Sequence, residues 1–157
     1  GKTRLSVVYD SAACGWDHEA FIKAMRTPSN AVVAVTDEGD VFGAFVSVGV
    51  ATTSTWHRDD GQFAFSFFSH GRCDVPQKWE MRDDRRFAGS DVWVSGPPSA
   101  SFVRFGFGAG YLRVGGGDRG SFVSKAGRWF SDLEDTALTG NGEGDFTTAR
   151  LLVVRLK

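Results

Sequence analysis

The sequence predicts a mostly β fold of two packed antiparallel sheets, a β-sandwich, with one clear helix and one or two short helical turns. Short runs of β-branched and aromatic residues recur along the chain and are separated by turn residues. Twenty of the 157 residues are glycine, roughly twice the usual share of about 7%. The fourteen phenylalanines and five tryptophans favour strands that pack face to face.

The chain is expected to form a single domain over residues 1–157. Its length suffices to bury a core without disulfides or a metal. No internal repeat and no linker-like stretch divides it.

The first elements are a short strand at residues 5–9, a loop at 10–16 and the clearest helix of the chain. Asp17 can cap a helix that starts at residue 18. Apolar residues at positions 20, 21, 24 and 25 give that helix one buried face. Thr27 and Pro28 end it, because a residue before proline avoids the helical region.

Residues 31–47 predict a β-hairpin. Two apolar runs flank a turn at 36–40, where Gly39 supplies a positive φ. In the return strand, Gly43 and Ala44 stand between Phe42 and Phe45. Small residues in that place indicate that another part of the backbone packs closely against them.

A polar stretch at 52–61 is expected to be a loop, and residues 62–67 then alternate as a strand. Phe63, Phe65 and Phe67 should share one face, which we expect to point into the core. Residues 78–82 alternate again and should pair with that strand. The mixed charges of residues 82–86 indicate a solvated loop.

The second half of the chain predicts further strands. They are expected at 91–94, at 101–114 as one strand or a bent pair, at 121–123, and at 146–156 as the closing strand. Residues 115–117 should form a loop, and the capping-box pattern of 131–134 allows one helical turn.

Charge and composition exclude several function classes. A net charge of −1 gives no electrostatic reason to expect nucleic acid or an anionic membrane as a partner. No apolar stretch reaches 18 residues, so we expect no membrane insertion. Two cysteines make no disulfide framework, which favours a cytoplasmic location.

Catalytic motifs are weak. The glycine-rich run at 106–120 lacks both the Gly-Lys-Ser/Thr of a phosphate loop and the G-x-G-x-x-G spacing of a dinucleotide fold. No G-x-S-x-G elbow occurs, and the carboxylate pairs Asp59-Asp60 and Asp83-Asp84 stand in polar loops where solvation is the default. We therefore expect a protein that is not an enzyme and uses no cofactor.

Two alternatives stay open. Cys14 with His18, and His70 with Cys73, have residue types and spacings that suit a tetrahedral zinc site, and hence a small metal-dependent or thiol-based enzyme. The simpler interpretation is that no metal binds and that neither cysteine is needed for function. The tryptophans could instead line a sugar site, as in a β-sandwich carbohydrate-binding domain.

Taken in order, these segments resemble the TLDc domain of the oxidation-resistance proteins. The similarity rests on the helix at 19–25, the hairpin at 37–45, the strand at 62–67 and the Lys78-Trp79 pair. The C-terminal end departs from the family pattern at 136–139 and 152–155, which indicates a divergent member. Residues that match the family as scaffold are Gly39, Phe42, Gly43, Phe45, Phe65, Gly115, Gly116 and Gly117.

The resemblance implies a function without an active site. It suggests an interaction or regulatory module linked to oxidative-stress resistance. The implied partner is a subunit of the vacuolar proton pump (V-ATPase), and the implied location is the cytosolic face of acidic organelles.

Overall fold

The computed structural model describes residues 3–70, 74–86, 89–108, 110–135, 137–139 and 144–157. Within them the chain forms eleven strands, three α-helices and two 3₁₀ turns. The strands are β1 Leu5–Asp10, β2 Asn30–Thr36, β3 Val41–Val46, β4 Trp56–Arg58, β5 Phe63–Phe68, β6 Gln77–Glu80, β7 Asp91–Val94, β8 Ser101–Phe105, β9 Leu112–Gly115, β10 Gly117–Val123 and β11 Asp145–Leu156.

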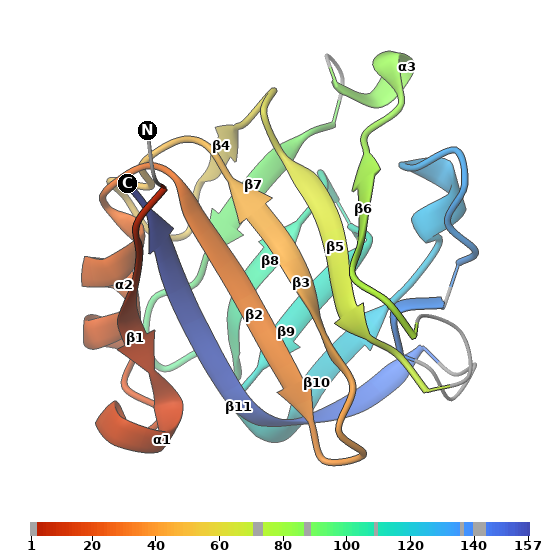
Figure 1. The fold of residues 1–157 in the computed structure, drawn as a ribbon. Helices are drawn as coiled ribbons and strands as arrows, with labels where there is room; N and C mark the ends of the chain where they lie inside the picture. Colours follow the sequence, from red (N-terminus) through yellow and green to blue (C-terminus); the bar gives the residue numbers. More distant parts are fainter. Residues whose placement is uncertain (1–2, 71–73, 87–88, 109, 136, 140–143) are drawn as a thin grey trace.

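The described strands are hydrogen-bonded in one antiparallel sheet, in the order β4-β7-β8-β9-β10-β11-β2-β3-β5-β6, with β1 also paired to β11. Figure 1 shows that this sheet folds over into two layers. The first layer holds β1, β11, β2, β3, β5 and β6, and the second holds β4, β7, β8, β9 and β10. Strand β11 joins them, because Thr148 and the residues before it pair with β10 while residues 148–155 pair with β2.

The predicted fold class is confirmed, with one difference in connectivity. The layers are antiparallel and packed as expected, but they are halves of a single sheet. The 12-residue strand β11 makes this possible, since it is long enough to pair with a different layer at each end.

The core lies between the layers. Alternate residues of the first layer, such as Val32, Phe42 and Leu151, meet residues of the second such as Phe105 and Leu112, and all five are completely buried. Because side chains alternate along a strand, this inner face fixes which residues point outward.

The predicted helix is confirmed as α2 (His18–Met25). The Asp17 carboxylate accepts hydrogen bonds from the backbone N–H groups of Glu19 and Ala20. Phe21 enters the core, with its ring 5.3 Å from that of Tyr9 and 5.4 Å from that of Phe102. In Figure 1, α2 lies beside β1, next to the short helix α1 (Ser11–Cys14), where a loop was expected.

Three other expectations for local structure were wrong. Residues 131–134 form a turn rather than a helix, because Phe130 and Leu133 are drawn into the core and Phe130 forms a β-bridge with Met81. The 3₁₀ turns lie nearby, at η1 (Ala126–Arg128) and η2 (Ala137–Thr139). The polar stretch 52–61 contains β4, and the charged cluster contains α3 (Asp83–Arg86).

The predicted hairpin turn is present between β2 and β3. Gly39 adopts a φ of 90°, and the Thr36 hydroxyl accepts a hydrogen bond of 3.0 Å from the backbone N–H of Asp40. None of the described helices has the length and apolar character needed to cross a membrane.

Candidate functional site

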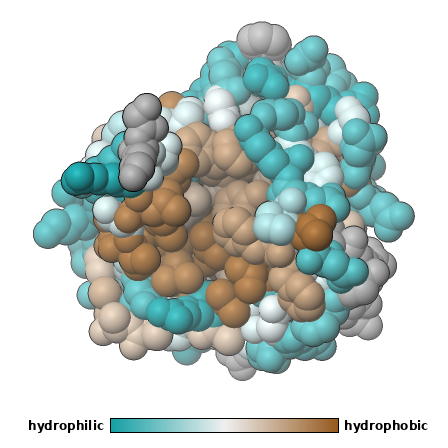
Figure 2. Space-filling view, in the orientation of Figure 1, coloured by the Kyte–Doolittle hydropathy of each residue, from teal (hydrophilic) through white to brown (hydrophobic). Residues whose placement is uncertain are grey.

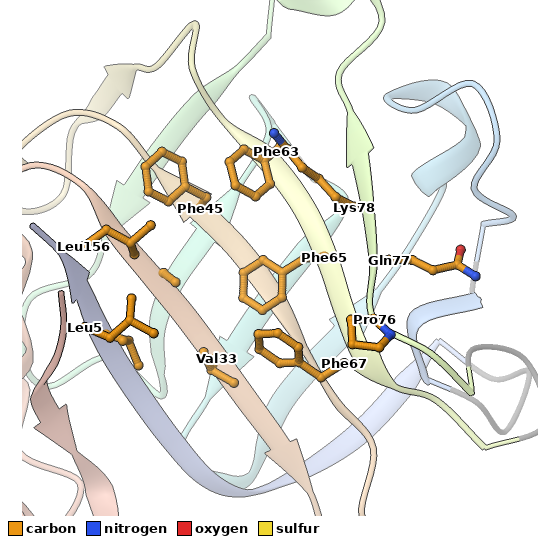
Figure 3. Close-up of a pocket in the computed structure, with 12 residues that line it drawn as sticks. Leu5, Val33, Phe45, Phe63, Phe65, Phe67, Pro76, Gln77, Lys78 and Leu156 are labelled. Atoms are coloured by element: carbon orange, nitrogen blue, oxygen red, sulfur yellow. The ribbon is translucent and has the colours of Figure 1, made fainter. Parts of the chain in front are cut away.

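The outer face of the first layer is hollowed into an apolar groove of about 520 Å³. Figure 2 shows it as a continuous hydrophobic area over the strands of this layer, and Figure 3 shows its phenylalanines side by side. We call it the outer groove; its lining residues are Leu5, Ala31, Val33, Phe45, Phe63, Phe65, Phe67, Pro76, Gln77, Lys78, Val154 and Leu156.

The phenylalanines of β5 point into this groove and not into the core. Phe63, Phe65 and Phe67 do share one face, as predicted, but Ala64 and Ser66 are the completely buried residues of the strand. The predicted direction was therefore wrong, because alternation alone does not say which face is covered.

A β-bulge extends the groove onto β1. Leu5 pairs with Leu156 and Val7 with Val154, so both face outward. The register then shifts by one residue, and Tyr9 pairs with Val153 on the inner face. The bulge thus lets one short strand supply Tyr9 to the core while Leu5 and Val7 stay 67% and 60% exposed.

The aromatic side chains of the groove are ordered by contacts with one another. The rings of Phe45 and Phe63 stack with centroids 4.8 Å apart, and those of Phe65 and Phe67 lie 5.2 Å apart. Lys78 is the charged side chain of the lining; its Nζ lies 4.0 Å from the centre of the Phe63 ring and 2.5 Å from the carboxylate of Glu80. Such a surface offers hydrocarbon contact and one rim cation, which suits binding rather than acid–base chemistry.

Gly43 shapes the floor of the groove. A Cβ on this residue would lie 1.8 Å from the carbonyl oxygen of Val32 and 3.0 Å from the ring of Phe65. The predicted close approach of backbone is thus confirmed, and the approaching strand is β2. The missing side chain lets the Phe65 ring lie across the strand.

The other family-scaffold residues fall in different places. Phe42 is completely buried between the layers, whereas Phe45 and Phe65 line the outer groove. Gly39 lies in the hairpin turn. The remaining three, which join β9 to β10, are Gly115, Gly116 and Gly117.

The described candidates for a metal site have different contacts. The His18 ring stacks on Phe102 with centroids 4.0 Å apart. His70 lies 2.8 Å from the Asp40 carboxylate through its Nδ1. Cys14 is exposed in α1, and Cys73 lies outside the described residues. In the part of the chain that the structure describes, no group of three or more His, Cys, Asp or Glu side chains could hold a metal.

The tryptophans do not gather at one place. Trp129 is nearly buried against Tyr111, while Trp56 and Trp93 pack together on the second layer with ring centroids 5.3 Å apart. Trp16 is 38% exposed and lines a pocket of about 460 Å³ with His18. These four tryptophans thus lie in three different places and do not form one common sugar-stacking surface.

Asp59 contradicts the prediction of a solvated carboxylate pair. It is completely buried, and its carboxylate accepts hydrogen bonds from the backbone N–H and hydroxyl of Ser47 and from the N–H of Gly61. Burial raises the pKa of the Asp59 carboxyl, and the Ser47 hydrogen bonds oppose that rise. Asp60 does stay at the surface, paired with Arg58 at 2.8 Å. The glycine two residues after Asp59 was the available signal for a carboxylate that caps a turn.

Comparison with known proteins adds no family. The chain matches no protein-family model, and no curated protein matches it. The site is therefore interpreted from its own geometry.

Proposed function

We propose that this chain is a non-enzymatic protein-interaction module that binds an apolar segment of a partner protein in the outer groove. The observation that carries the proposal is a contiguous hydrocarbon surface on a sheet face that no element of the described chain covers. Monomeric proteins rarely leave such patches open, and patches of this kind mark interaction sites.

The aromatic lining suits a protein ligand. Phenylalanine rings held in place by stacking lose little conformational entropy on binding, and aromatic anchors dominate interface energetics. The cation of Lys78 stands at the rim, where it is paired with the carboxylate of Glu80, so an acidic group of the bound segment could reach it only by exchanging that partner. The expected ligand is an amphipathic segment with two or three large apolar side chains.

The family resemblance suggests which partner to test first. A TLDc-like module would bind a cytosolic subunit of the vacuolar proton pump and contribute to oxidative-stress resistance at acidic organelles. The choice of partner rests on the similar order of motifs in residues 5–156. The groove itself is observed in the structure and does not depend on that similarity.

Binding of purified soluble pump subunits to the immobilised chain tests the proposal. We expect Phe67→Ser to weaken binding more than about fivefold, the effect typical of an interface anchor. Phe107→Ser is the matched control, because Phe107 is 57% exposed and Phe67 51% exposed, and Phe107 packs on Trp56 of the second layer.

Different outcomes separate the parts of the proposal. If the unchanged chain does not bind the pump subunits, the pump is not the partner. If Phe67→Ser and Phe107→Ser weaken binding equally, the outer groove is not the binding surface. A stable dimer in light scattering that only Phe67→Ser dissociates would show that a second copy of the chain occupies the groove, against the proposal.

A further inference from the structure

The outer face of the second layer carries a row of arginines between aromatic rings. The registered pairs run from β4 to β10: Trp56 opposite Trp93, Trp93 opposite Arg104, Arg104 opposite Arg113, and Arg113 opposite Phe122. Residues beside them in the strands, such as those at 92, 94, 103, 105, 112, 114 and 123, are buried in the core. The row therefore faces outward; we call it the arginine row, Trp56, Trp93, Arg104, Arg113 and Phe122.

Each guanidinium lies against a ring. The Cζ of Arg104 is 5.9 Å from the Trp93 ring centre, and the Cζ of Arg113 is 5.9 Å from that of Phe122. The Nε atoms of both arginines are buried and make no hydrogen bond. The face of a ring attracts each cation without neutralising it.

The positive charge of the pair is uncompensated. Like charges directly opposite each other on neighbouring strands destabilise a sheet. Burial, and the charge of Arg113, lower the pKa of Arg104. Within the described residues no ion pair involves either arginine; the carboxylates placed closest by register are Asp91, on β7 with Trp93, and Asp145, opposite Phe122.

We propose that Arg104 and Arg113 bind the phosphate of a nucleotide, whose base stacks on a ring of the arginine row. A phosphate has enough acceptor oxygens for two guanidinium forks at once, which suits a pair of arginines side by side. Neighbouring strands lie about 5 Å apart, so the flanking rings lie within one or two strand spacings of the phosphate, within reach of an attached base.

The neighbouring charges favour a free nucleotide over a nucleic-acid strand. Asp145, opposite Phe122, stands near one end of the cationic pair and would repel further phosphates of a chain, while Asp91 at the other end lies opposite Arg58. A net charge of −1 likewise gives no long-range attraction to a polyanion. The surface thus complements one anionic group with one attached ring.

Calorimetric titration of the chain with adenosine monophosphate at low salt tests this. Arg104→Gln and Arg113→Gln should each weaken binding by at least about tenfold, the loss expected for a charge-assisted hydrogen bond. Arg26→Gln, which changes an exposed arginine after α2, should leave binding unchanged. Thermal unfolding of each variant checks its fold, and two single variants ensure that misfolding of one leaves the other as a test.

Three comparisons can overturn the assignment. If adenosine binds as tightly as its monophosphate, the phosphate does not contribute to binding. If inorganic phosphate binds as tightly as the nucleotide, the base does not contribute to binding. If a short single-stranded oligonucleotide binds far more tightly, the ligand is a nucleic acid. Phe67→Ser should not alter nucleotide binding, which separates this site from the outer groove.

Discussion

The two outer faces of this molecule belong to one sheet and follow one alternation, yet they carry opposite chemistry. On the first layer the outward residues are hydrocarbon, as with Val33 and Phe65. On the second they are arginines between rings, as with Arg104 and Trp93. The inner faces of both layers are mainly apolar because they share one core. Packing constrains the inner positions in the same way throughout, whereas it leaves the outer positions free to differ.

The strongest test of this comparison sets an inner phenylalanine against an outer one. Phe42→Ala should lower the free energy of unfolding by about 3–5 kcal/mol, because the completely buried ring leaves a cavity. Phe67→Ala should change it by less than about 1 kcal/mol, since half of that side chain is exposed already. Urea unfolding monitored by circular dichroism measures both. Similar losses would mean that the groove is part of the core.

Gly43→Ala tests the floor of the outer groove. The added methyl group would meet the Val32 carbonyl oxygen and the Phe65 ring, so β2 and β3 must shift apart. We expect a loss of about 1–3 kcal/mol in the free energy of unfolding, as for an overpacked site. Ala44→Gly, on the neighbouring inner position, is the control for a general change in the strand. An unchanged stability for Gly43→Ala would show that the strands part easily.

Much of the fold could be predicted because local signals and the fold agree. Asp17 caps α2, Pro28 follows its end, and Gly39 makes the hairpin turn, each through backbone chemistry that depends on a few neighbouring residues. The short strand β4 and the turn after Phe130 could not be predicted. Their structure depends on pairing with Trp93 and Met81, which are distant in the sequence.

The chemistry of the two outer faces was harder to predict than the fold. Alternation showed that Phe63, Phe65 and Phe67 share a face, but which face is covered depends on where the second layer lies. The arginine row was invisible for the same reason, since Arg104 and Arg113 become neighbours only through the β8–β9 register. A local pattern reports the period of a strand and not its surroundings.

The buried carboxylate between the two faces gives a prediction about pH. Asp59→Asn should lower the free energy of unfolding by about 1 kcal/mol through weaker hydrogen bonds to Ser47 and Gly61. The folded-state pKa of Asp59 is raised, so its stabilising contribution is complete below the ordinary carboxyl range and is lost as pH rises through the folded-state value. The loss caused by Asp59→Asn should therefore be larger in acid than at neutral pH. Unfolding curves of both proteins at each pH measure it, and a loss that grows with pH would contradict the raised pKa.

The smallest expected effect concerns the arginine row in the absence of ligand. Repulsion between Arg104 and Arg113 should lower the stability of the unliganded chain by a few tenths of a kcal/mol, up to about 1 kcal/mol. Added sodium chloride screens this repulsion, so the stability of the unchanged chain should rise relative to that of Arg113→Gln between about 10 and 150 mM salt. Taking the difference between the two proteins cancels the salt dependence of ion pairs elsewhere, such as Arg150 with Asp10. Parallel salt responses would show that the two cations do not interact, and the row would then lack the uncompensated charge that sets it apart from the outer groove.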